Sequence, residues 1–124
     1  MEYVDNAYKL QIFTLRRTAH FPKRYQRRIG NDIEESASLI HACAVRAEES
    51  KDIFDEEQFS IRRTNLRKAF NECAVLVARI KVADDVFGIP YNYIEEWMEY
   101  IDKEQKVLIG VIRSDNRRRS RVTG

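Results

Sequence analysis

A run of positively charged side chains between residues 16 and 28 is the part of the sequence best suited to bind a ligand. Its cations are Arg16, Arg17, Lys23, Arg24, Arg27 and Arg28, and no carboxylate lies among them. Aromatic rings are interleaved with these cations: His20, Phe21 and Tyr25. Cations with aromatic neighbours suit contacts to phosphates and stacking on bases. The run therefore predicts an anionic partner such as RNA or single-stranded DNA.

The position of these cations relative to helix ends separates two explanations for them. A helix C-terminus favours positive charge, so Arg16 and Arg17 at the end of one helix need no ligand. A helix N-terminus disfavours positive charge, so Lys23 and Arg24 at the start of the next helix favour an anionic ligand. Further cations extend the predicted nucleic-acid surface onto a later helix: Arg62, Arg63, Arg67 and Lys68. The alternative is that these charges only solvate helix faces, since the net charge is +2.

The sequence offers no pattern typical of catalysis or metal binding. Its soft ligands are His20, His41, Cys43 and Cys73, and none has the spacing of a zinc site. In a hairpin of the second and third helices the two cysteines would lie about 15 Å apart, too far for a disulfide. We expect reduced, buried thiols, no metal, no cofactor, no catalytic residues and no enzymatic activity.

Length and composition indicate a single helical domain. The chain has 124 residues, with only four glycines and two prolines, which favours helices over a β-sandwich or barrel. No apolar run approaches the roughly 20 residues of a membrane span, and no signal peptide is visible. We therefore expect a cytoplasmic protein with no membrane partner.

Apolar residues at helical spacing predict four helices. The first two cover about residues 4–19 and 22–47 and are separated by Phe21-Pro22. The third follows the acidic segment 48–57 and runs to about residue 86, where Gly88-Ile89-Pro90 ends it. The fourth carries the apolar residues from Ile94 to Ile112. Asp52 or Asp55 is expected to cap the third helix. Gly30 lies inside the second helix, where glycine costs about 1 kcal/mol relative to alanine.

The first helix is apolar around much of its circumference. Its regular stripe, predicted to face the core, comprises Val4, Tyr8, Ile12, Leu15 and Ala19. Tyr3, Leu10 and Phe13 lie off this stripe. We interpret these three as an interface with a neighbouring subunit, which predicts a homo-oligomer. The alternative is that they are scattered surface residues, which are common.

Four helices with short connections predict an all-α fold, an up-down-up-down four-helix bundle. The bundle is expected to span residues 1–112, and residues 113–124 to form a basic, disordered C-terminal tail. This topology places the basic run at one end. It places the acidic segment 48–57 and the basic tail together at the other end, where they could pair.

The same basic run resembles a family motif. Phe21-Pro22-Lys23, a basic residue at Arg27 or Arg28, then Ile29-Gly30 and Ile33 resemble the F-P-K-x-x-R-x-x-L-G-x-x-I pattern of small four-helix bundle proteins. That superfamily includes the accessory variability determinant (Avd) proteins of diversity-generating retroelements and the ribosomal-RNA intervening-sequence proteins.

The resemblance to Avd proteins implies a ring of five subunits. It also implies a non-catalytic accessory role in mutagenic reverse transcription, with the element's reverse transcriptase and its RNA or cDNA as partners. The resemblance to intervening-sequence proteins implies the alternative: a protein-interaction or structural bundle that does not bind nucleic acid.

Overall fold

The computed structural model describes the backbone of residues 1–123 and the side chains of residues 1–121, and this part of the chain is helical without β-strands. Its helices are α1 (Glu2–Thr18), α2 (Lys23–Tyr25), the π-helix η1 (Gln26–Gly30), α3 (Asn31–Glu49), α4 (Glu56–Phe87) and α5 (Tyr91–Thr123). The predicted all-α class with four long helices is confirmed.

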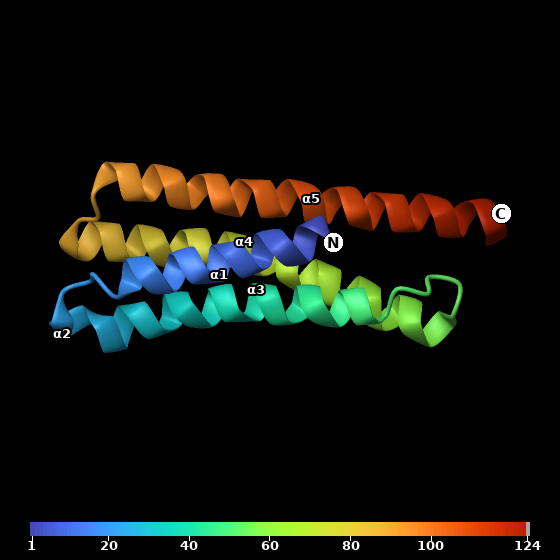
Figure 1. Ribbon diagram of the computed structural model, residues 1–124, viewed down its shortest axis with the longest axis horizontal. Coiled ribbons are helices and arrows are strands. Elements are labelled where there is room, and N and C mark those ends of the chain that lie inside the picture. Colours follow the sequence, from blue (N-terminus) through green and yellow to red (C-terminus); the bar gives the residue numbers. More distant parts are fainter. Residues whose placement is uncertain (124) are drawn as a thin grey trace.

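The four long helices lie side by side along the length of the molecule (Figure 1). Helix α1 packs against α3 and α5, and α4 packs against the same two helices. The junction between α1 and α3 lies at the same end as the connection between α4 and α5. The connection between α3 and α4 lies at the opposite end, where α5 also terminates. The basic run therefore forms one end of the molecule, which we call the basic tip (residues 16–28).

Local signals in the sequence explain where α4 begins and ends. Asp55 caps α4, since its carboxylate accepts a hydrogen bond from the Gln58 amide at 2.9 Å. Gly88 ends the helix with a φ of 79°, a conformation that favours glycine. The Asp84 carboxylate then accepts a 2.8 Å hydrogen bond from the Ile89 amide. The prediction of Asp55 as one of two possible caps is confirmed, and Asp52 instead accepts a hydrogen bond from the Phe54 amide.

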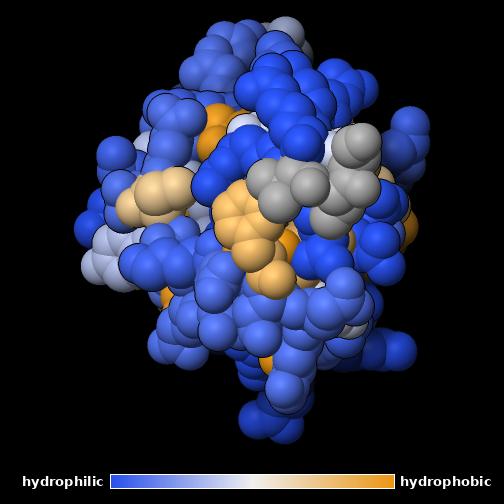
Figure 2. All heavy atoms as spheres, turned by 90° about the vertical axis from the view of Figure 1, so that its right-hand side faces the viewer, coloured by the Kyte–Doolittle hydropathy of each residue, from blue (hydrophilic) through white to orange (hydrophobic). Residues whose placement is uncertain are grey.

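Apolar residues at helical spacing on the later helices form the core. Buried members include Ile33 and Ile40 on α3, Leu66 and Ile80 on α4, and Trp97, Ile101 and Leu108 on α5. Viewed from the end where α5 terminates, apolar surface occurs only as separate patches among hydrophilic residues (Figure 2). The core thus lies along the axis of the molecule, as the helical periodicity predicts.

The prediction for α1 was wrong in its orientation. Tyr3, Leu10 and Phe13, predicted to contact another subunit, are buried in the core of their own chain. Tyr8 is 54% exposed and Leu15 is 42% exposed, although both were predicted to face the core. Both stripes have helical spacing, so periodicity alone could not decide between them. The inward side also carries polar groups that find partners: the buried Thr14 hydroxyl accepts a 3.0 Å hydrogen bond from the Trp97 indole.

Helix α5 continues beyond residue 112, where the sequence predicted the start of a disordered tail. Asp115 is buried, and the Arg119 guanidinium donates to the Ile53 carbonyl at 2.7 Å and to Glu56 at 2.6 Å. These contacts hold residues 113–121 against the acidic connection. Pairing between the basic C-terminal segment and this connection therefore occurs within one chain.

A buried polar network joins all four long helices. Arg62 on α4 is only 5% exposed and forms a 2.6 Å ion pair with Asp115 on α5. Its guanidinium also donates at 3.1 Å to the Tyr3 hydroxyl on α1 and to the Ala47 carbonyl on α3. The Tyr3 hydroxyl in turn donates to Glu48 at 2.7 Å. Burial lowers the pKa of Arg62, but the hydrogen bond to Asp115 and its neighbours more than offset this, so the side chain stays charged.

Replacing Arg62 with methionine should lower the free energy of unfolding by about 3–5 kcal/mol, because Asp115 would be left as an unpaired buried charge. Urea unfolding followed by circular dichroism measures this loss. The double variant Arg62→Met, Asp115→Leu removes both charges and should recover most of the lost stability. A double variant as unstable as the single one would contradict this account.

Glu104 is a second buried ionisable side chain, but it has no hydrogen-bond partner within the described residues. Its side chain is 0% exposed, and neither carboxylate oxygen has a hydrogen-bond partner within the described residues. Burial, and then the negative charge of Glu2, raise the pKa of Glu104 from 4.5 to about 9. The folded protein therefore retains a proton at neutral pH that the unfolded chain releases.

The free energy of unfolding should fall as the pH rises from about 4.5 towards 9, because the folded state binds the extra proton over this range. The loss should reach about 3 kcal/mol at pH 7. Glu104→Gln should flatten this dependence, measured by urea unfolding at several pH values. Glu99→Gln, at an exposed position of the same helix, is the matched control and should keep the slope.

Candidate nucleic-acid interface at the basic tip

The turn between α1 and α2 brings the two halves of the basic run together. After α1, the His20 amide donates to the Arg17 carbonyl at 3.1 Å and the Phe21 amide to the Thr18 carbonyl at 3.0 Å. Pro22, with φ −54° and ψ 137°, leaves the helical conformation, and its carbonyl accepts the first hydrogen bonds of the next helical segment. The break predicted at Phe21-Pro22 is confirmed.

Gln26 closes this turn, and sequence reasoning missed it. Its side-chain amide donates to the Ala19 carbonyl and to the Phe21 carbonyl, both at 3.0 Å. Gln26 also begins the π-helix η1, which continues into α3 at Asn31. No sequence pattern could have predicted that Gln26 closes the turn, because its hydrogen-bond partners are backbone carbonyls of the preceding segment.

Gly30 lies where the second helical segment crosses α1. A Cβ atom at this position would contact side-chain atoms of Phe21 and Thr18 at 3.8 Å, an ordinary packing distance. The close neighbours of Gly30 are thus side chains of the preceding turn, and the glycine has a helical φ of −60°.

An aromatic cluster anchors the basic tip to the rest of the bundle. Phe21 is buried, and its ring lies 4.8 Å from the ring of Phe87 at the end of α4. Tyr25 stacks on Phe87, with ring centroids 5.3 Å apart and an interplanar angle of 18°. Phe21 also lies 6.4 Å from Trp97 on α5. Ring packing therefore holds the tip against α4 and α5, and the Thr18 hydroxyl adds a hydrogen bond to the Glu34 carboxylate on α3.

The cations of the tip are accessible. Arg16, Lys23, Arg24, Arg27 and Arg28 are exposed, and Arg17 is half-buried. The Arg17 guanidinium lies 4.2 Å from the centre of the Tyr93 ring, and the Arg24 guanidinium 5.2 Å from that of Tyr25. Within the described residues, no carboxylate forms an ion pair with any of the six. All six predicted binding residues of this run thus surround one end of the molecule.

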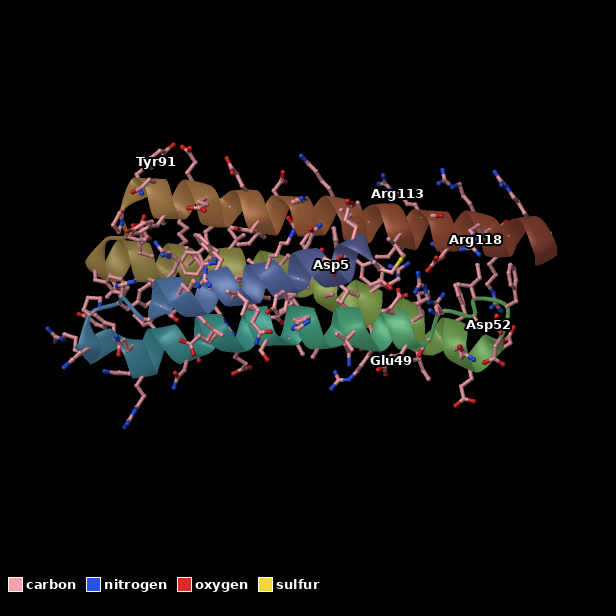
Figure 3. The ribbon with its side chains drawn as sticks, viewed as in Figure 1. Asp5, Glu49, Asp52, Tyr91, Arg113 and Arg118 are labelled. Atoms are coloured by element: carbon pink, nitrogen blue, oxygen red, sulfur yellow. The ribbon has the colours of Figure 1, made fainter. Side chains whose placement is uncertain are left out.

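The predicted binding residues on α4 lie away from the tip. Arg62 is buried in the network described above, so its prediction as a nucleic-acid contact was wrong. Arg63, Arg67 and Lys68 are exposed. They lie about 30 Å along α4 from Phe87, which packs against the tip. Arg113 and Arg118 are also distant, on the part of α5 that extends beyond the start of α1 (Figure 3).

The remaining reactive side chains are buried or structurally engaged. Cys43 and Cys73 are buried as reduced thiols, and burial raises the pKa of Cys73 to about 12. The His41 Nδ1 atom lies 2.8 Å from the Gln11 Oε1 atom. Within the described residues, no three histidine, cysteine or carboxylate side chains gather in a way that could hold a metal ion.

Two findings complete the description of the site. None of the helices in residues 1–123 has a stretch long and apolar enough to cross a bilayer. Comparison of the chain with protein-family models, with curated proteins and with solved structures yields no match.

Proposed function

We propose that this protein is a non-catalytic nucleic-acid-binding subunit that contacts single-stranded RNA or DNA through the basic tip. The observation that carries the proposal is the set of six accessible or half-buried cations at one end of the bundle, none of them paired with a carboxylate of the described chain. Lys23 and Arg24 occupy the first turn of a helical segment, where positive charge is unfavourable without an anion.

The resemblance of residues 21–33 to Avd proteins extends this proposal to a biological setting. The protein would support mutagenic reverse transcription in a diversity-generating retroelement, with the reverse transcriptase and its RNA or cDNA as partners. The chain would form an up-down-up-down bundle, and its tips would gather several sets of cations in a ring of subunits. The reverse transcriptase and the count of five subunits rest on the resemblance, whereas nucleic-acid binding also rests on the charges of the tip.

Reversing the charge of Arg24, Arg27 and Arg28 together should weaken binding to a single-stranded oligonucleotide at least tenfold. Loss of three phosphate contacts should also reduce the salt dependence, lowering the slope of log affinity against log salt concentration by about 2. Fluorescence anisotropy at several salt concentrations measures both effects. The matched control reverses the charges of Arg63, Arg67 and Lys68, which lie outside the tip. It should change the affinity less than the tip variant does. Unchanged binding in the tip variant would refute the proposal.

The outward stripe of α1 supports self-association. This stripe comprises Val4, Tyr8, Ile12, Leu15 and Ala19, and it presents two large apolar side chains that are more than 40% exposed. A hollow of about 580 Å³ between α4 and α5 offers a complementary surface, since Ile94 and Met98 line it beside Glu95, Glu99 and Asp102. Lys9 is exposed beside the stripe and would face these carboxylates. Such a contact between two different surfaces can close into a ring.

The double variant Tyr8→Glu, Leu15→Glu should dissociate the oligomer, because it places charge in an apolar contact. Light scattering coupled to size-exclusion chromatography measures the mass. The control variant Val82→Glu changes a valine that is 55% exposed on α4, outside both surfaces, and should leave the mass unchanged. A monomeric wild-type protein would contradict self-association.

The second candidate function is a protein-interaction or structural bundle of the intervening-sequence type. The exposed apolar stripe of α1 is the observation that favours it, because such a stripe serves protein contacts as well as ring assembly. This candidate predicts no retention of nucleic acid at physiological salt. The oligonucleotide measurement above therefore distinguishes the two candidates.

A further inference from the structure

The basic tip contains a small cavity that the charges alone do not explain. Its volume is about 210 Å³, and it lies between the turn after α1 and the connection from α4 to α5. Its aromatic and apolar walls include Phe21, Phe87, Ile89 and Tyr93, and His20 and Arg17 lie at its polar side. For comparison, an apolar protein cavity of about 150 Å³ binds benzene. This cavity is thus large enough for one aromatic ring system, but smaller than the roughly 300 Å³ at which pockets for drug-sized ligands begin.

The walls of the cavity are held in place by contacts already described. The rings of Phe21 and Phe87 pack edge to face at 66°. Gly88 and the Asp84–Ile89 hydrogen bond fix the connection that forms the opposite wall. A ligand would therefore meet a preformed site and would not have to order a loop.

Arg17 is incompletely satisfied beside this cavity. Its guanidinium stacks over Tyr93 at 4.2 Å and lies 5.2 Å from the ring of Phe13. Its Nε atom is buried and has no hydrogen-bond partner within the described residues. A buried donor without a partner is unusual. The polar groups that line the cavity, and that a ligand with acceptor atoms would meet, belong to Arg17 and His20.

The cations near the cavity indicate which kind of ligand would fit it. Lys23 follows Pro22, which lines the cavity. The Arg24 guanidinium lies over the ring of Tyr25, which stacks on Phe87 in the cavity wall. A flat ring with acceptor atoms fits the cavity, and a phosphate attached to it fits the cations outside. A nucleotide within a single strand combines both features, whereas an aromatic side chain of a protein lacks the phosphate.

We propose that this cavity binds one unstacked nucleobase of a single strand, while Lys23 and Arg24 contact the adjoining phosphates. The inference rests on the proposed function and adds to it a site for one base. Tyr93 would serve as a stacking platform, as aromatic side chains do in other proteins that bind single strands. The tip would therefore distinguish a strand that carries bases from a bare sugar–phosphate chain.

The test compares two fluorescently labelled oligonucleotides of about twelve nucleotides, in the range of known single-strand sites. One strand is abasic throughout. The other is abasic except for a single 2-aminopurine at its central position. The protein should bind the base-containing strand roughly 5- to 150-fold more tightly, the range expected for stacking of one base on an aromatic side chain. Anisotropy measures the affinity, and quenching of 2-aminopurine fluorescence reports stacking.

Tyr93→Leu should abolish the preference for the base and leave binding to the abasic strand unchanged. Ile89→Trp, which fills the cavity, should have the same effect and provides a second route if the first variant is unstable. Phe54→Leu is the matched control, because Phe54 is an aromatic residue that is 52% exposed in the α3–α4 connection and does not line the cavity.

The outcomes separate this inference from the proposed function. Equal affinity of the wild-type protein for both strands, with salt-dependent binding retained, would overturn the base site alone. A preference for the base that persists in both cavity variants would also overturn it. Absence of binding to either strand would overturn both proposals. If a purified reverse transcriptase then bound through this cavity, an aromatic side chain of that partner would be favoured as the occupant of the cavity.

Discussion

The buried guanidinium of Arg62 is the constraint on which the packing of the four long helices depends. It bonds to α1 through Tyr3, to α3 through the Ala47 carbonyl and to α5 through Asp115. A charge in a low-dielectric interior is tolerated only when its partners are correctly placed. Any rotation of α1 or shift of α5 that separated these groups would leave the charge uncompensated. The network therefore determines which side of α1 faces inward and extends the packing of α5 beyond residue 112.

The two ends of the molecule are stabilised by different interactions, and this difference leaves the basic tip available for binding. Near the α3–α4 connection, cations are paired: Arg62 with Asp115, and Arg119 with Glu56. At the other end, Phe21, Tyr25 and Phe87 position the chain by ring packing. The Thr18 hydroxyl donates to the Glu34 carboxylate there, but none of the six cations of the tip forms an ion pair within the described residues. The aromatic residues that provide this packing also form the cavity beside Arg17.

The orientation of α1 links the fold to assembly. Its inward side is lined by Tyr3, Leu10 and Phe13, so its second apolar stripe faces solvent. A helix with two apolar sides can pack within its own bundle and against another molecule. The prediction that α1 has an apolar side beyond the needs of the bundle agrees with the exposed Tyr8 and Leu15, but it named the wrong residues for that side.

The sequence by itself determined the helical class, the break at Phe21-Pro22, the end of α4 at Gly88 and the spacing of the apolar residues on α3, α4 and α5, and it narrowed the cap of α4 to Asp52 or Asp55. These features depend on periodicity and on backbone preferences of a few neighbouring residues. Only the tertiary structure decided which stripe of α1 is buried, that Arg62 is internal, that α5 continues past residue 112 and that Gln26 closes the tip. Each of these depends on a partner distant in sequence, such as Asp115 for Arg62, or on a backbone carbonyl, such as those of Ala19 and Phe21 for Gln26. Local spacing cannot reveal such a partner, because a charged or polar side chain has the same local pattern whether it faces water or a buried counterpart.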